Sequence, residues 1–319
     1  MSKGTWIIVI CAFFVLLLCC SLFLPIPVEI KKEITIESSI VNVSGQVTDL
    51  RNWKHWYPFF EEKDTSSLHY SYSTTTVNSF LHFDKHQYTI VNVNAAAITI
   101  KEETDGRAIY QSLTAEPDSF GRFTHVRWIK AITPFIWLKE RFSLTREMRT
   151  GLNNLKIFME DPNQLYGFPI EIRPTADTLV IIKEAVISKK DAHITLQGLY
   201  SDLHQYILSN NINSNGQRMA GFVTMENYKM KVTAGVPVNK KVPEKNGISY
   251  LRMPASGRML VGKFEGAYQN INQLYNAMDR YIADKSLRKV ALSYEKYLTD
   301  PQSSLDSLHM KIEVYFPIY

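Results

Sequence analysis

Cysteine is nearly absent from this 319-residue sequence, and its three copies are confined to one place. Cys11, Cys19 and Cys20 all lie in a single apolar run near the amino terminus. The rest of the chain has none, which excludes disulfide bonds and a cysteine metal site there. His82 and His86 lie in strand-like sequence, where a spacing of four residues does not aim both rings at one metal ion. We therefore expect no metal and no cofactor.

Long runs of like charge are missing too. The net charge is only +5, from 36 basic and 31 acidic residues that are dispersed along the chain. This pattern argues against a nucleic-acid partner. The sequence also lacks a Gly-x-Ser-x-Gly turn, a phosphate-binding glycine loop and a dinucleotide fingerprint. The apolar content of 45% and the chain length are instead typical of two globular domains.

The apolar run extends from Trp6 to Leu24 and holds no charged residue over its 19 positions. At about 1.5 Å rise per residue, a helix of this length matches the roughly 30 Å hydrocarbon core of a bilayer. A cleaved signal peptide is the alternative, but its apolar part is shorter and is followed by small residues, which are missing here. We therefore predict a single-pass anchor in residues 6–24, with a linker to residue 32 and the body of the protein outside the cytoplasm.

Residues 33–172 are predicted to form a first domain. Alternating residues indicate a strand over 33–40, and a short aromatic segment follows at 47–60. Apolar residues at three- and four-residue spacing then indicate one closing helix over 144–159. Between these segments lie runs typical of an antiparallel meander: 69–75, 79–83, 88–93, 97–102, 108–115 and 121–129.

This order of elements resembles the helix-grip fold of the START-like, polyketide-cyclase SRPBCC superfamily. The local match comprises Asp49 to Pro58 (DLRNWKHWYP) and Gly151 to Lys156 (GLNNLK) in the closing helix. The resemblance implies an antiparallel sheet and a long C-terminal helix around an apolar cavity. Trp53 and Trp56 are interpreted as core residues, with cavity lining as the alternative. Residues 132–137 are interpreted as a short connection that replaces a longer one.

The second predicted domain, residues 173–319, contains an internal repeat. Gly198-Leu-Tyr200 and Gly266-Ala-Tyr268 each open a predicted helix. The string MKVTAGVP from Met230 is echoed by MKIEVYFP from Met310. Duplication of one strand-helix-strand-strand unit explains both matches, with chance similarity of short strings as the alternative. Two such units side by side predict a groove between them, where pockets commonly form.

One acid stands out in this repeat. If residues 293–297 form a strand, Ser293, Glu295 and Tyr297 share one face, and no Lys or Arg lies on that face within the strand. The first repeat has no counterpart acid between Arg218 and Thr224. Either Glu295 faces solvent or its carboxylate awaits a partner, since an unpaired buried charge costs several kcal/mol.

The strings Gly266-Ala-Tyr268 and YEKYLTDP from Tyr294 resemble the GyrI-like effector-binding domain, found as the ligand sensor of AraC-type and multidrug-responsive regulators. The likeness covers residues 173–319. It implies that Glu295 lies at the bottom of an aromatic pocket between the repeats and meets cationic, hydrophobic ligands. Tyr268 and Tyr297 are the implied walls, and Tyr315 is a further ligand-binding candidate if its strand register turns it inward. No helix-turn-helix region is predicted, which argues against direct transcription control.

The predicted fold class is therefore α+β, with a helix-grip domain and a GyrI-like domain of two repeats. The favoured function is membrane-anchored binding of a hydrophobic or cationic small molecule through Glu295. Two alternatives stay open. Glu295 could be the general base of a hydrolase of electrophilic small molecules, or the chain could be a structural ectodomain in which Glu295 has no role.

Overall fold

The computed structural model describes residues 6, 27–60, 67–175, 178–188, 191–241, 243–253, 257–299 and 309–319. The chain divides into two compact units between Asp161 and Pro162. Within the described ranges, no helix is both long and apolar enough to cross a membrane. Residues 7–24 of the predicted anchor, and Asp300 and Pro301 of the quoted string, lie outside the described residues.

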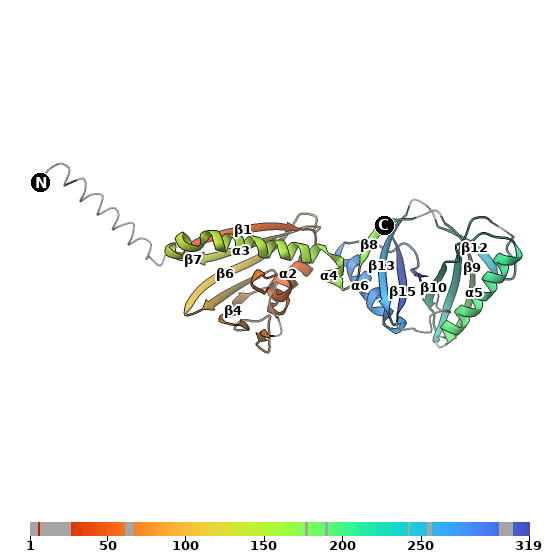
Figure 1. Cartoon of the computed structure of the whole chain (residues 1–319), viewed down its shortest axis with the longest axis horizontal. Coiled ribbons are helices and arrows are strands. Elements are labelled where there is room, and N and C mark those ends of the chain that lie inside the picture. Colours follow the sequence, from red (N-terminus) through yellow and green to blue (C-terminus); the bar gives the residue numbers. More distant parts are fainter. Residues whose placement is uncertain are drawn as a thin grey trace. The chain divides into compact units, whose positions relative to one another are not determined.

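The first unit is one antiparallel sheet with a long helix along one face (Figure 1). The sheet order is β1-β7-β6-β5-β4-β3-β2. Helix α3 packs on β1 and β7. The elements are β1 (Val28–Ile36), α2 (Ile40–Thr48), the 3-10 turns η1 (Leu50–His55) and η2 (Pro58–Phe60), β2 (His69–Tyr70), β3 (Phe80–Phe83), β4 (His86–Val93), β5 (Ala97–Thr104), β6 (Arg107–Pro117), β7 (Thr124–Ile132) and α3 (Pro134–Glu160).

The meander and the closing helix agree with the sequence pattern, but α3 is longer than predicted. It begins at Pro134, so residues 132–137 are the end of β7 and the first helical turn rather than a connection. Thr133 caps the helix by accepting a hydrogen bond from the Ile136 amide, and Pro134 has a backbone angle suited to the first turn. The periodicity missed these turns because their large apolar side chains face solvent.

The core of the first unit is aromatic. Trp53 and Trp56 are fully buried, as predicted, and the Trp53 ring stacks on Tyr57 at 4.7 Å. The indole nitrogen of Trp53 donates to the carbonyl of Val47 at 2.9 Å, so its one polar group is satisfied inside the core. These rings hold the short helical segment between α2 and the sheet.

Gly151 lets α3 approach this core, and we expect a side chain there to be costly. A Cβ at Gly151 would lie 2.7 Å from the Trp128 ring and 2.8 Å from the Pro58 ring, and both rings are rigid. We expect Gly151→Ala to lower the free energy of unfolding by about 1–3 kcal/mol, although alanine favours helix. Gly45 in α2 has nothing within 4 Å of its Cβ position, so Gly45→Ala should instead stabilise by about 0.5–1 kcal/mol. Denaturation followed by tryptophan fluorescence reports this unit alone, because all five tryptophans precede Leu138. Equal effects at both glycines would contradict the packing argument.

The second unit is an eight-stranded antiparallel sheet in the order β12-β9-β11-β10-β14-β15-β13-β8. The elements are α4 (Pro162–Tyr166), β8 (Ile170–Pro174), β9 (Thr178–Ser188), α5 (Ala192–Ser209), β10 (Arg218–Thr224), β11 (Lys229–Val238), β12 (Ile248–Met253), β13 (Arg258–Gly266), the 3-10 turn η5 (Tyr268–Asn270), α6 (Ile271–Asp284), β14 (Tyr294–Tyr297) and β15 (Met310–Ile318).

The sheet order confirms the internal repeat. Each half runs strand, helix, strand, strand, as β9-α5-β10-β11 and then β13-α6-β14-β15. The halves join through antiparallel pairing of β10 with β14, so they share one sheet. Helix α5 packs on β9 and β11 and α6 packs on β13, which leaves β10 and β14 between the two helices. The two halves therefore meet at the β10–β14 seam of a single sheet, and not as two sheets with a groove between them.

Some boundaries differ from the sequence pattern. Helix α5 begins at Ala192 rather than at Gly198, and the edge strands β8 and β12 carried no recognisable signal. The expected domain limit near residue 172 falls inside β8. Because β8 pairs with β13, it is part of the second sheet.

Candidate functional site

Glu295 lies in the middle of β14 with its side chain toward the apolar core of the second unit. In the sheet register it stands opposite Ala220 on β10 and Val314 on β15, and both of those belong to that core. Only 2% of Glu295 is exposed. Of the two alternatives left by the sequence, solvent exposure is therefore excluded.

Three tyrosine hydroxyls donate hydrogen bonds to this carboxylate. The hydroxyl of Tyr297, two residues along the same strand, lies 2.7 Å from Oε2. The hydroxyl of Tyr268 in η5 lies 3.0 Å from Oε2 and 3.2 Å from Oε1. The hydroxyl of Tyr275 in α6 lies 3.1 Å from Oε1. The site thus draws on the strand at the seam of the sheet and on the helical segment of the second repeat.

The Glu295 carboxylate lies in an apolar environment, which determines the electrostatics of the site. Burial raises the pKa of Glu295, and the hydrogen bonds from Tyr297, Tyr268 and Tyr275 offset only part of that rise. Burial and the nearby carboxylate in turn raise the pKa of Tyr275, so its hydroxyl stays protonated and donates. In the described part of the chain, tyrosine hydroxyls and no cationic groups compensate this carboxylate.

The first repeat contributes the far side of the site. Tyr200 of α5 is buried, and the Glu295 carboxylate helps to raise its pKa, although burial is the main cause. Its hydroxyl donates to the carbonyl of Met219 at 2.7 Å, and the guanidinium of Arg218 lies 5.3 Å from its ring centre. An open pocket of about 370 Å³ beside these groups is lined by Arg218 and Tyr297 among others. Tyr297 thus lines this pocket and also donates to the Glu295 carboxylate.

The structure brings together Glu295, Tyr268 and Tyr297, but not Tyr315. Tyr315 stands opposite Tyr294 in the register of β14 and β15, which turns both rings to the other face of the sheet. There the two rings stack at 4.8 Å, and the Tyr315 hydroxyl donates to Glu313 at 2.6 Å. Tyr315 was a ligand-binding candidate only if the strand register turned its ring toward Glu295, and the observed register turns it away.

The comparison with protein families agrees with this geometry. The family described as "GyrI-like small molecule binding domain" matches residues 168–319. Residues 168–319 form a GyrI-like domain. A domain of this kind binds small molecules.

Solved structures similar to the chain have low sequence identity to it. The crystal structure of the EcmrR C-terminal domain is 15% identical, with a TM-score of 0.42, and the match covers 48% of this chain and 98% of that one. A cryo-EM structure of an EcmrR–DNA complex is 14% identical, with a TM-score of 0.44 and coverage of 57% and 71%. A crystal structure of a hydrolase from Listeria innocua is 10% identical, with a TM-score of 0.37 and coverage of 47% and 91%. No curated protein matches the sequence.

Sequence reasoning missed two residues of the GyrI-like site, Tyr275 and Tyr200. Tyr275 follows Tyr268 by two helical turns, so the two share a helix face. Tyr200 is the counterpart of Tyr268 in the repeated Gly-x-Tyr string. Both signals were present, but they become specific only once the helices are placed on either side of the seam of the sheet.

Removing the Tyr275 hydroxyl tests how the carboxylate is held. We expect Tyr275→Phe to raise the pKa of Glu295 further, because one donor to the charged form is lost while burial is unchanged. The free energy of unfolding of the GyrI-like domain should fall by about 1–3 kcal/mol. NMR titration of labelled glutamate measures the first effect and circular dichroism the second. Tyr294→Phe, on the other face of the sheet, is the control and should leave the titration of Glu295 unchanged.

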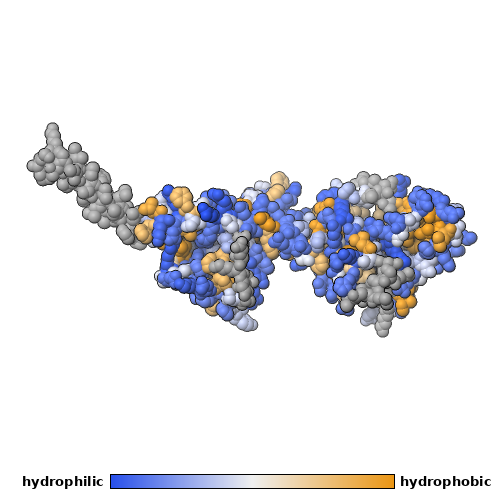
Figure 2. All heavy atoms as spheres, viewed as in Figure 1, coloured by the Kyte–Doolittle hydropathy of each residue, from blue (hydrophilic) through white to orange (hydrophobic). Residues whose placement is uncertain are grey.

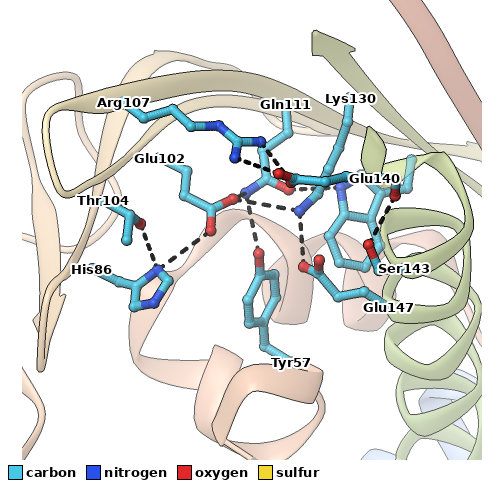
Figure 3. Close-up of polar contacts among 11 residues, drawn as sticks. Tyr57, His86, Glu102, Thr104, Arg107, Gln111, Lys130, Glu140, Ser143 and Glu147 are labelled. Carbon is cyan, nitrogen blue, oxygen red and sulfur yellow. Dashed lines mark hydrogen bonds and ion pairs between the residues drawn. The ribbon is translucent and has the colours of Figure 1, made fainter. Parts of the chain in front are cut away.

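A second polar cluster lies in the first unit, between the sheet and α3 (Figure 3). Lys130 of β7 is 1% exposed, and its Nζ lies 2.8 Å from Glu147 of α3 and 3.4 Å from Glu102 of β5. Gln111 donates to both Glu102 and Tyr57 at 3.1 Å. An open pocket of about 350 Å³ is lined mainly by charged and polar side chains, Lys130, Glu102 and Glu147 among them, together with Ile109 and Leu144. Charged side chains thus predominate in the lining of this pocket, whereas the helix-grip resemblance implies an apolar cavity.

Proposed function

We propose that the GyrI-like domain binds a hydrophobic organic cation, with Glu295 as the charge partner and Tyr268 and Tyr297 as aromatic walls. The observation that carries the proposal is a buried carboxylate whose donors in the described part of the chain are three neutral hydroxyls. The tyrosines keep Glu295 satisfied without a ligand, but they do not neutralise it. A bound cation would supply the positive charge that this arrangement lacks.

The rings and the carboxylate contribute different parts of the affinity. A cation at the face of a tyrosine gains about 0.5–2 kcal/mol when it is desolvated. A buried carboxylate adds Coulomb attraction, which is stronger in the interior than in water. Because burial raises the pKa of Glu295, its ionised form is the costly one, and pairing with a cation relieves that cost. These terms together favour a ligand that is both apolar and positively charged.

Calorimetric titration of the full chain tests this function with two probes of similar shape. Tetraphenylphosphonium is a lipophilic cation, and triphenylphosphine oxide is uncharged. The proposal expects measurable binding of the cation and much weaker binding of the neutral compound. Equal affinity for both would remove Glu295 as the charge partner. A hydrolase would instead turn over an electrophilic ester and lose that turnover in Glu295→Gln.

We also infer, from the sequence, that residues 6–24 anchor the protein in a membrane with its body outside the cytoplasm, and that the first unit is a helix-grip domain. The uncharged run of 19 residues supports the anchor. The antiparallel sheet and the long α3 support the fold. Resistance of the membrane-bound protein to alkaline extraction tests the anchor, and protease digestion of intact cells tests the side on which the body lies.

A further inference from the structure

The first turns of α3 present large apolar side chains to solvent. Phe135 is 48% exposed, Leu138 is 56% exposed and Phe142 is 74% exposed. At spacings of three and four residues they fall on one face of the helix. Figure 2 shows hydrophobic surface at the end of the first unit where β1 begins. An apolar helix face of this kind commonly marks a protein or membrane contact.

Basic side chains accompany and continue this face. Lys139 is exposed beside Leu138, and Arg146 and Arg149 are exposed one and two turns beyond Phe142. The Arg141 guanidinium lies 4.6 Å from the ring centres of both Trp137 and Phe142, so a cation and two aromatic rings form one group. A helix face that combines aromatic and basic side chains is typical of contact with the headgroup region of an anionic bilayer.

The sheet register places this face next to the end of the apolar run. Val28, the first residue of β1, pairs with Ile132, the last residue of β7, and α3 begins two residues later at Pro134. Only residues 25–27 separate Leu24 from Val28, a link that spans at most about 14 Å when fully extended. If residues 6–24 cross a bilayer, this end of the unit is therefore held close to the membrane surface.

The other end of α3 has a different surface. Its exposed residues are Asn153, Ile157 and Glu160, a single apolar side chain between a polar and an acidic one. Exposed apolar side chains are thus concentrated at the end that the short link ties to the run, and exposed basic side chains extend from Lys139 along the helix to Arg149. This asymmetry is expected if a bilayer lies beside the start of β1.

We propose that the first turns of α3, through Phe135, Leu138 and Phe142 with their basic neighbours, lie in the headgroup region of an anionic lipid bilayer. The inference rests on the proposed anchor for its geometry. The contact would fix the orientation of the first unit at the membrane instead of leaving it to swing on residues 25–27. Lys139 and Arg146 would pair with lipid phosphates while the apolar side chains insert between headgroups.

Depth-dependent quenching on the full chain tests the contact. A fluorescent label is placed at Leu138→Cys, with the three native cysteines changed to alanine, and the protein is reconstituted in vesicles that contain brominated lipid. The control label is at Ile157→Cys, which is 60% exposed on the same helix and about 28 Å away along its axis. We expect the label at 138 to lose most of its fluorescence and the label at 157 to lose little. Quenching at 138 should increase when phosphatidylglycerol replaces part of the phosphatidylcholine.

The outcomes separate this contact from the anchor. Equal quenching at the two positions overturns the proposal. Resistance to alkaline extraction without quenching at 138 also overturns it, and leaves the anchor intact. Quenching at 138 in protein that alkali releases supports the surface contact and removes the anchor. Covering of the α3 face by a second copy, or by residues 6–24 themselves, would shield the label from lipid and thus counts against a bilayer. Charge reversal by Lys139→Glu with Arg146→Glu should abolish the dependence on phosphatidylglycerol, and persistence of that dependence counts against the basic residues.

Discussion

Glu295→Gln should weaken binding of tetraphenylphosphonium by about 2–4 kcal/mol, roughly 30- to 1,000-fold in Kd. The substitution keeps the size of the side chain and one acceptor oxygen for the tyrosine hydroxyls, but it removes the charge. Since Glu295 is buried and no described cation compensates it, the ligand would lose its charge partner in the site. Calorimetric titration of both proteins measures the difference directly.

Two controls isolate the effect of the charge. Binding of triphenylphosphine oxide should be almost unchanged in Glu295→Gln, because an uncharged ligand gains little from the carboxylate. Glu313→Gln removes another buried carboxylate that accepts a tyrosine hydroxyl, but on the opposite face of the sheet, where Arg173 pairs with it. That variant should keep its affinity for the cation. If both glutamate variants lose affinity equally, the effect is one of domain stability and the assignment of Glu295 fails.

The pH dependence of this site has a definite sign. Burial raises the pKa of Glu295 above the value of about 4.3 expected in the unfolded chain. The protonated form is therefore favoured on folding, so this group's contribution to stability is fully present below the unfolded pKa and is lost as the pH rises through the folded pKa. Cation binding changes in the opposite direction, because it needs the ionised form. We expect the affinity for tetraphenylphosphonium to fall as the pH decreases through the folded pKa in the wild type. Glu295→Gln should show no such dependence.

Part of this site could be predicted from the sequence, and there is a physical reason why some of its residues were predictable and others were not. Glu295 was found because strand alternation left one acid without a partner on its face, and Tyr297 shares that face by the same rule. Tyr315 was placed by a register that alternation within one strand does not fix. Only the pairing of Tyr294 with Tyr315 settles which way that ring turns. Tyr275 depends on how α6 lies over the sheet, which its own periodicity does not determine.

The fold shows the same limit. Strands β10 and β11 and the order of the repeat could be predicted, because alternation and duplication are local signals. The first three turns of α3 were missed because their exposed apolar residues do not mark a face directed at the core. The edge strands β8 and β12 were missed because each has only one neighbour and is short. Merging of the repeats into one sheet depends on pairing between β10 and β14, which no single strand specifies.

The buried ion cluster of the first unit carries the largest expected effect on stability. We expect Lys130→Met to lower the free energy of unfolding of that unit by about 3–5 kcal/mol, because Glu102 would stay buried without a cation. Burial opposes ionisation of Glu102, but attraction to Lys130, the hydrogen bond that Lys130 donates and the nearby His86 ring overcome it, so the pKa of Glu102 is lowered in the folded protein. Its stabilising contribution is thus present above the unfolded pKa of about 4.3 and is lost as the pH falls through the folded value. Tryptophan fluorescence during denaturation measures the change in this unit.

Two further variants decide whether an unpaired charge causes that loss. Adding Glu102→Gln to Lys130→Met should restore most of the stability, since Gln111 can still donate to an amide oxygen at this position and Glu147, which is 30% exposed, can turn to solvent. The partly exposed pair of Lys101 and Glu103 on the same sheet, 2.7 Å apart, is the matched control. Lys101→Met should cost less than about 1 kcal/mol.

The pH dependence of Lys130→Met is a second test. In this variant the pKa of Glu102 should rise because the ion pair with Lys130 is gone. The stability deficit relative to the wild type should therefore shrink as the pH falls through that raised pKa. A deficit independent of pH, with no rescue by Glu102→Gln, would show that Lys130 acts by packing its stem and not by its charge.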